Sequence, residues 1–271
     1  MKPNIFEPHE DLIDFVQCYW TIESYKEDTP QINTIVPDGT MKMIFHYGDL
    51  YWHHPPNRKR FLQPRCFLIG QLTRPYIVEP EGDTGTFVVR FHPHGFLPFT
   101  TIPIKEMENT PVAIERLFGE AAIALEQKIL SAKSTADRIQ TIETFLLDRL
   151  NSKEVTDRIV QSTIETITSA KGQLSIEELS LKSNLNRRQL SRKFSSEIGL
   201  SPKQLSKTIR LQATLRMLLD NDGTSLTDLA YENEFYDQAH FIKEFKAFTG
   251  HTPKEFYGEN LKMSMVFDRL K

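Results

Sequence analysis

Apolar and polar positions divide the chain of 271 residues into a front part with strand-like patterns and a rear part with helical ones. After a PDGT turn, residues 41–47 alternate apolar side chains with Lys42 and His46, which is the period-two pattern of a half-buried strand. Further strands are predicted where β-branched and aromatic residues lie between Gly or Pro, at 66–70, 76–79 and 86–91. We expect a small antiparallel barrel or sandwich.

The pattern changes to helical spacing from Pro111 onward. The segment 111–130 is rich in Ala and Leu, and apolar residues recur at every third or fourth position between 139 and 150. The periodicity lapses at 151–154, and a new helix with Ile159, Val160 and Ile164 on one face then begins. Helical patterns continue from there to about Gly258, so a second, wholly helical domain is expected.

An internal repeat occupies about the last hundred residues. SIEELS from Ser175 matches SLTDLA from Ser225, and NRRQLSRKF from Asn186 matches DQAHFIKEF from Asp237, about fifty positions further on. The second segment of each pair begins with Asn or Asp, which suits a helix N-cap. Two short helices joined by a tight turn, present twice, form a tandem helix-turn-helix.

Helix-start and helix-stop signals stand at equivalent places in both copies. Each copy opens with a capping box, Ser175 with Glu178 and Ser225 with Asp228. Each closes on Gly-x-Ser/Thr-Pro, where Gly ends one helix, the hydroxyl residue caps the next and Pro takes its first position. Between the copies, helical spacing over 202–221 predicts one continuous helix. Such a helix could hold two recognition helices about one DNA turn, ~34 Å, apart.

The first copy is strongly basic, although the whole chain has a formal net charge of −3. On the helix that follows Asn186, Leu190 and Phe194 recur at core spacing, which turns Arg188 and Arg192 outward. A solvated helix face is the alternative for any lone basic pair. Against it, the segment 182–216 contains Glu197 as its single acid and nine cations: Lys182, Arg187, Arg188, Arg192, Lys193, Lys203, Lys207, Arg210 and Arg216. This excess predicts an anion-binding surface, with phosphates as the anion.

The second copy is acidic at its start. Six acids between 220 and 237 come with no Lys or Arg until Lys243, so a weaker hold on DNA is expected there. The candidate contacts on its second helix are Gln238, Ala239, His240 and Lys243. His240 adjoins Phe241, so packing is the alternative for this side chain.

The rear domain resembles the AraC/XylS family of bacterial transcription regulators. The stretch DLAYENEFYDQAHFIKEFKAFTGHTPKEF, residues 228–256, is similar to the family signature nearly end to end, and the resemblance covers roughly 155–258. It implies two helix-turn-helix units on a long helix, with Arg188, Ser191 and Arg192 as base readers in the first unit. In the second unit the base readers would be Gln238, Ala239 and Lys243. Arginine forks suit guanine O6 and N7.

One residue departs from the family pattern. Glu234 stands in the second turn where the family usually has Gly. A non-Gly residue in a left-handed turn costs about 1 kcal/mol, and a carboxylate there would face the expected DNA.

The front part looks similar to a ligand-sensing β-domain found ahead of such modules. The landmarks are PDGTMKMIF from Pro37, GQLTRPY from Gly70 and TFVVRFHPHG from Thr86. This resemblance implies a cupin-like regulatory domain, followed by helices that often carry dimer contacts. The ligand does not transfer with the fold.

Together these features predict an α+β chain with an N-terminal β-rich barrel or sandwich domain, a helical connector and a C-terminal all-α tandem helix-turn-helix domain. The expected segments are 1–110 for the β-rich sensing domain, 111–152 for the connector and dimerisation segment, 153–258 for the DNA-binding domain, and 259–271 for a tail. We expect a sequence-specific DNA-binding transcription regulator without enzymatic activity or cofactor.

Double-stranded DNA is the expected partner. A small-molecule effector, a second copy of the chain and, for an activator, RNA polymerase are further candidates. Contacts with DNA are expected from Arg187, Arg188, Ser191, Arg192, Lys193, Lys203, Gln238, Ala239, His240 and Lys243. The opening MKPNIFEPHE lacks the apolar core of a signal peptide, and no run reaches the length of a membrane span, so we expect a cytoplasmic protein without membrane contact.

Two enzymatic alternatives remain open at the level of sequence. His92 and His94 invite a metal site, with His46, His53 and His54 as further ligands, which would make the front part a metal-dependent cupin-type enzyme. A DNA-repair alkyl acceptor would need an activated thiol at Cys18 or Cys66.

The aromatic residues of the front part also allow two interpretations. They either line a small-molecule pocket or pack in the core. They are Trp20, Tyr47, Tyr51, Trp52 and Phe91.

Overall fold

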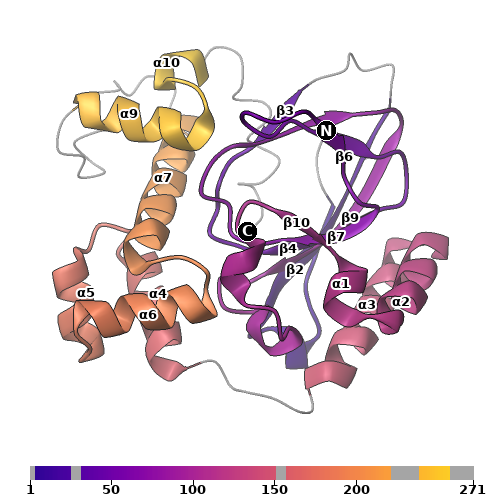
Figure 1. Ribbon diagram of the computed structural model, residues 1–271, viewed down its shortest axis with the longest axis horizontal. Coiled ribbons are helices and arrows are strands. Elements are labelled where there is room, and N and C mark those ends of the chain that lie inside the picture. Colours follow the sequence, from indigo (N-terminus) through magenta and orange to yellow (C-terminus); the bar gives the residue numbers. More distant parts are fainter. Residues whose placement is uncertain (1–3, 26–31, 151–156, 221–237, 257–271) are drawn as a thin grey trace.

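The computed structural model describes residues 4–25, 32–150, 157–220 and 238–256, and it confirms the α+β class (Figure 1). Two antiparallel sheets form the front domain. The six-stranded sheet has the order β1-β2-β9-β4-β7-β10 and the four-stranded sheet the order β3-β8-β5-β6. The strands are β1 (Asn4–Phe6), β2 (Val16–Ser24), β3 (Asn33–Ile35), β4 (Lys42–His46), β5 (Tyr51–His53), β6 (Phe61–Leu62), β7 (Cys66–Ile69), β8 (Tyr76–Pro80), β9 (Thr84–Phe91) and β10 (Pro111–Ala113).

The remaining regular elements of the described chain are helices. Short 3-10 helices are η1 (Glu10–Leu12), η2 (Leu97–Phe99) and η3 (Ile104–Met107). The α-helices are α1 (Ile114–Phe118), α2 (Glu120–Ser131), α3 (Thr135–Leu150), α4 (Arg158–Ser169), α5 (Ile176–Ser183), α6 (Arg187–Glu197), α7 (Pro202–Asp220), α9 (Gln238–Thr249) and α10 (Pro253–Glu255). Among the described helices, none is long and apolar enough to cross a membrane.

The central strand β4 is buried on both faces, so the prediction of a half-buried strand is wrong. Met43 and Phe45 face the main core, in which α2 and α3 cover the six-stranded sheet. Lys42 and His46 point to the opposite side and are only 4% and 3% exposed. The four-stranded sheet covers that side, and polar side chains tolerate the burial because each finds hydrogen-bond partners.

A hydrogen-bonded network fills the space between the two sheets. His46 Nδ1 lies 3.2 Å from Thr86 Oγ1, and His46 Nε2 lies 3.0 Å from Gln63 Oε1. The Gln63 amide in turn donates to the Tyr76 hydroxyl at 3.0 Å. The His53 ring stacks on Tyr76 with ring centres 3.8 Å apart. The network therefore joins β4 and β9 of one sheet to β5 and β8 of the other.

A buried ion network fixes the turn between β3 and β4. Lys42 Nζ donates to Asp38 Oδ1 at 2.9 Å, and Arg90 Nη2 donates to Asp38 Oδ2 at 3.1 Å. The Thr40 hydroxyl also donates to Asp38 at 2.8 Å. Burial alone would raise the pKa of Asp38, but the two cations and these hydrogen bonds outweigh it and bring the pKa to about 2. The carboxylate is thus charged at any physiological pH, and it ties this turn to β4 and β9.

The helix predicted over 111–130 is interrupted in two places. Pro111–Ala113 forms β10 and pairs with β7, with Val112 opposite Leu68. Gly119 then separates α1 from α2. A free edge of the main sheet was available to this short segment, and tertiary pairing prevailed over helix propensity.

The buried histidine of the inter-sheet network makes stability depend on pH. Burial lowers the pKa of His46 to about 4, whereas an unfolded histidine titrates near ~6.5. The unfolded chain binds the proton more readily, so stability falls as the pH drops from about 6.5 toward 4. At pH 5 the expected loss from this group is about 2 kcal/mol relative to pH 8. His46→Gln should remove this loss. The free energy of unfolding in urea, measured at pH 8 and at pH 5, tests this expectation.

His94 serves as the comparison, because burial also lowers its pKa to about 4. His94→Gln should reduce the same pH dependence, and the double variant should reduce it further. An unchanged difference between pH 8 and pH 5 in His46→Gln would contradict the assignment.

Candidate nucleic-acid interface

The first helix-turn-helix unit is formed by α5 and α6, and both helices begin at the predicted residues. Ser175 and Glu178 form a complete capping box at the start of α5. Asn186 caps α6, and here too the box is complete because Gln189 bonds back to the Asn186 backbone. Asn184 ends α5 in the left-handed conformation with φ 54°. The turn between the two helices is thus set by local hydrogen bonds.

The core of this unit orients α6. Leu190 and Phe194 are fully buried against α4 and α5 in one cluster. Arg188 and Arg192 lie on the opposite side and are exposed, while Ser191 is half-buried at the margin. The predicted orientation of α6 is confirmed.

Several cations of the first unit are paired with acids, so the predicted excess of positive charge is too large. Arg187 Nη2 lies 2.6 Å from Glu177 Oε1. Lys193 pairs with Asp157, and its hydrogen bond lowers the pKa of that carboxyl. The count over 182–216 missed both acids, because they lie earlier in the chain.

Three candidate DNA contacts on α6 and α7 keep an unneutralised charge, as does Lys243 on α9 among the described residues. Over the described ranges, Arg188, Arg192 and Lys203 form no ion pair, and all three are exposed. Arg188 and Arg192 stand four residues apart on α6, and Lys203 is the second residue of α7. These side chains are therefore the best placed for phosphates and base edges.

The described part of the second unit is α9 with the turn to α10. Phe241 and Phe245 are fully buried, while Gln238, Ala239, His240 and Lys243 are exposed. The predicted end of the repeat is confirmed, because Thr252 and Glu255 form a capping box. Gly250 has φ 82° and its counterpart Gly199 has φ 81°, a left-handed conformation that favours glycine.

Four predicted features of the second unit lie outside the described residues. They are the capping box of Ser225 with Asp228, the N-cap at Asp237, the acidic segment at the start of the unit, and Glu234, which departs from the family pattern.

A half-buried carboxylate on α9 links this helix to α7. Glu244 Oε2 accepts from Arg210 Nη2 at 3.1 Å, and Lys207 pairs with the other carboxylate oxygen. His240 Nε2 lies 3.4 Å from Glu244 on the same helix. Burial raises the pKa of Glu244, but hydrogen bonds and charges from Lys207 and Arg210 outweigh it, and the pKa is lowered. No pattern in the sequence indicated this contact, because its partners are more than thirty positions apart.

The continuous helix α7 joins the two units as predicted. It spans Pro202–Asp220, with α6 near one end and α9 near the other (Figure 1). At ~1.5 Å per residue its length approaches one DNA turn.

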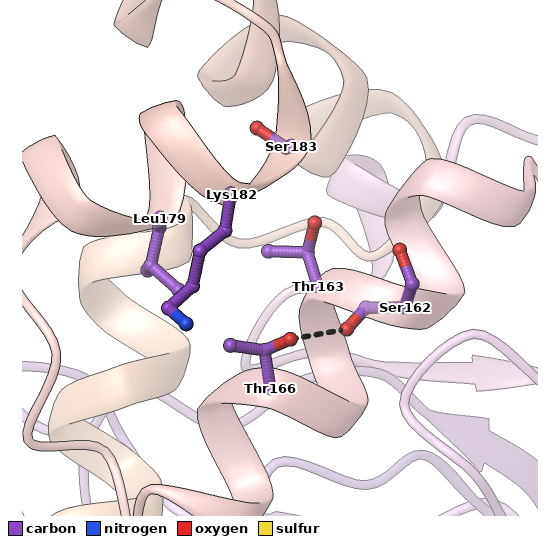
Figure 2. A pocket seen from close by; sticks show the side chains of 6 residues that line it. All are labelled: Ser162, Thr163, Thr166, Leu179, Lys182 and Ser183. Atoms are coloured by element: carbon purple, nitrogen blue, oxygen red, sulfur yellow. Dashed lines mark hydrogen bonds between the residues drawn. The ribbon is translucent and has the colours of Figure 1, made fainter.

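Figure 2 shows a pocket between α4 and α5, where Lys182 reaches toward serine and threonine side chains. Its four hydroxyl groups all donate to carbonyl oxygens of the preceding helical turn: Ser162 and Thr163 to Ile159, Thr166 to Ser162, and Ser183 to Ser180. The hydroxyls therefore offer lone pairs to the pocket, and these repel an anion. Lys182 is the one group suited to an anion among the residues that line it, so we assign no anion site here.

Four of the five histidines proposed as metal ligands are engaged by the protein, and the fifth, His94, lies with its ring centre 6.1 Å from that of His92. His46 and His53 belong to the inter-sheet network, and His54 pairs with Glu79 at 2.8 Å. His92 bonds to the Ile13 carbonyl at 3.1 Å. Among the described residues, no group of three or more His, Cys, Asp or Glu side chains could hold a metal ion.

Neither cysteine has the properties of an activated thiol. Cys18 and Cys66 are both buried, and burial raises the pKa of each. A nucleophilic thiol requires the opposite shift.

The aromatic residues of the front part divide between core and surface. Phe91 lies in the main core and Trp20 is buried beside Cys18. Tyr51 packs between the sheets, whereas Tyr47 and Trp52 are covered by Arg138 and Arg60, respectively. These contacts favour packing over a ligand pocket for Tyr47, Trp52 and Phe91.

Two family models match the chain. Residues 179–258 match the model described as a helix-turn-helix domain, and residues 4–113 match a domain of unknown function, DUF6597. An uncharacterized HTH-type transcriptional regulator of Staphylococcus aureus is 35% identical over 86 residues, which are 32% of this chain and 11% of that protein. The HTH-type transcriptional regulator MtrA of Neisseria gonorrhoeae is 33% identical over 82 residues, 30% of this chain and 27% of its own length. The chain thus matches only a small part of the curated relatives.

Among solved structures, ToxT from Vibrio cholerae has a TM-score of 0.48 at 13% identity, covering 88% of this chain and 97% of that one. The C-terminal domain of AraT, a response regulator from Geobacillus stearothermophilus, has a TM-score of 0.36 at 24% identity, covering 38% and 87%. The repeated unit, its caps and the family match define the class of the rear domain. The chain carries an AraC-type helix-turn-helix domain behind a domain of the DUF6597 family.

Lys203 and Lys207 both lie on α7 and look equivalent in the sequence, but in the structure Lys207 forms an ion pair and Lys203 does not. Lys203→Gln removes an unpaired charge, so the plot of log binding constant against log salt should become less steep by about 0.9. Lys207→Gln removes the same charge from the same helix, but Lys207 is held in an ion pair with Glu244 and not offered to a phosphate, so the slope should change much less. DNA titrations between low and moderate salt measure both slopes. Equal changes in the two variants would show that Lys207 also contacts phosphate.

Proposed function

We propose that the chain is a sequence-specific DNA-binding transcription regulator that reads major-groove bases with α6 and α9. The observation that carries this proposal is the tandem arrangement itself, in which α6 and α9 pack near the two ends of one continuous α7, with Arg188 and Arg192 exposed and unpaired on α6. Guanidinium groups on the outer face of such a helix can reach guanine edges. The matches to HTH-type transcriptional regulators support it.

Within this proposal the two units contribute unequally. Arg188, Ser191 and Arg192 read bases from α6, and Lys203 holds a phosphate. Arg187 and Lys193 each form an ion pair with an acidic side chain, so they contribute less to the affinity for DNA than the unpaired cations do. On α9, the corresponding side chains are Gln238, Ala239 and Lys243, with His240 beside them.

The remaining parts of the proposal concern the whole protein. The chain acts in the cytoplasm without enzymatic activity, and residues 1–110 form the domain that modulates DNA binding, through a small-molecule effector. Residues 111–152 connect the domains and carry the contacts of a homodimer, residues 153–258 bind DNA, and 259–271 form the tail. RNA polymerase is a partner if the regulator activates.

The assignment of Arg192 as a base reader predicts a sequence-dependent loss. Arg192→Ala should cost about 1–3 kcal/mol for the cognate site and relax specificity at one base pair. Lys203→Ala, which removes a phosphate contact, should weaken all sequences alike. Fluorescence anisotropy with cognate and random duplexes gives both losses. Equal losses on the two duplexes for Arg192→Ala would refute its role as a base reader.

In-vitro selection of bound DNA tests the function as a whole. An enriched motif with two half-elements about one helical turn apart supports base reading by both units. A single short element would assign the reading to α6 alone, and the absence of any enriched motif would overturn the proposal.

A further inference from the structure

A residue of the front domain lies in the hydrophobic core beneath the second recognition helix. Val36, which follows β3, is 4% exposed and clusters with Leu211 and Leu215 of α7 and with Phe241 and Phe245 of α9. Phe256 closes the same cluster. Phe241 and Phe245 are fully buried there. The packing that positions α9 therefore includes a side chain from a different domain.

The turn that carries Val36 is docked on α7 by further contacts. Gln212 Nε2 donates to the Pro37 carbonyl at 2.6 Å. Gly39 approaches the helix so closely that an added Cβ would lie 3.0 Å from Leu205 Cδ1. From the other side, Asp38 ties the same turn to the buried cations of β4 and β9. Val36 is thus presented to α7 by a rigidly held turn.

The first unit is built differently. Its hydrophobic cluster draws, among the described residues, only on side chains between 160 and 209. The front domain touches this unit at the turn after α6, where an added Cβ at Gly199 would lie 3.0 Å from Ile104 Cγ2, and at Leu205, against which Gly39 packs without contributing a side chain. Ile104 itself belongs to the core of the front domain. The front domain therefore contacts the first unit without adding a side chain to its hydrophobic cluster, whereas it contributes Val36 to the hydrophobic cluster of the second unit.

We infer that Val36 is a positioning residue for α9, so that the second unit reads its DNA element only while the front domain is docked on α7. This inference rests on the proposed function and deepens it, because it names which of the two units the front domain controls. Undocking would remove Val36 from the cluster and leave a space beside Phe241 and Phe245, which surrounding side chains fill only in part. Loss of the docked state would thus loosen α9 while α6 remains packed on its own core.

The test compares two valine truncations in the full chain. Val36→Ala removes two methyl groups beneath α9, and Val112→Ala removes the same groups from the main core of the front domain, where Val112 is 6% exposed. Affinity is measured on the selected DNA with both half-elements and on DNA with the α6 element alone. Val36→Ala should lower the affinity for the DNA with both half-elements about tenfold, and it should leave the affinity for the DNA with the α6 element alone unchanged. Val112→Ala should leave the ratio of the two affinities unchanged.

A second variant avoids the cavity altogether. Gln212→Glu places a carboxylate against the Pro37 carbonyl and should undock the turn from α7. The ratio of the affinity for DNA with both half-elements to the affinity for DNA with the α6 element alone should then fall. A hydroxyl-radical footprint should also lose the protection of the α9 element. Wild-type affinity ratios in both Val36→Ala and Gln212→Glu would overturn the inference, as would a selected site with the α6 element alone. Failure of the wild-type chain to bind any selected DNA would instead overturn the proposed function.

Discussion

The buried ion network around Asp38 is the constraint on which the arrangement of the two domains depends. One carboxylate accepts hydrogen bonds from two cations that are themselves almost fully buried. A buried charge of this kind is costly unless it is paired, so the turn from Pro37 to Thr40 cannot move without breaking several strong contacts. Because the same turn packs on α7, the interior of the front domain determines where the linking helix lies.

Local features of the DNA-binding part could be predicted from the sequence. The capping boxes at Ser175 and Asn186, the core spacing of Leu190 and Phe194, and the helix ending before Gly199 all depend on residues within a few positions of one another. Hydrogen bonds and packing over such short separations leave a direct pattern in the chain. The outward direction of Arg188 and Arg192 followed from the same spacing.

Features that depend on distant segments could not be predicted in this way. Lys42 and His46 looked solvent-facing because nothing nearby in the sequence shows that a second sheet covers them. The charge count of the first unit failed for a similar reason, since Asp157, Glu177 and Glu244 all lie outside the counted segment 182–216. The role of Val36 was equally hidden, because its neighbours in the core begin at Leu211.

The pairing of Glu244 with Lys207 and Arg210 also shapes how the protein meets a polyanion. At the α7–α9 contact the carboxylate of Glu244 offsets one of these two positive charges, whereas Arg188 and Arg192 of α6 are exposed and form no ion pair among the described residues. Long-range attraction acts on such exposed charges before any groove is entered. On the proposed function, the unpaired arginines of α6 therefore attract an approaching duplex, while the ion pairs of Glu244 keep Lys207 and Arg210 at the contact between α7 and α9.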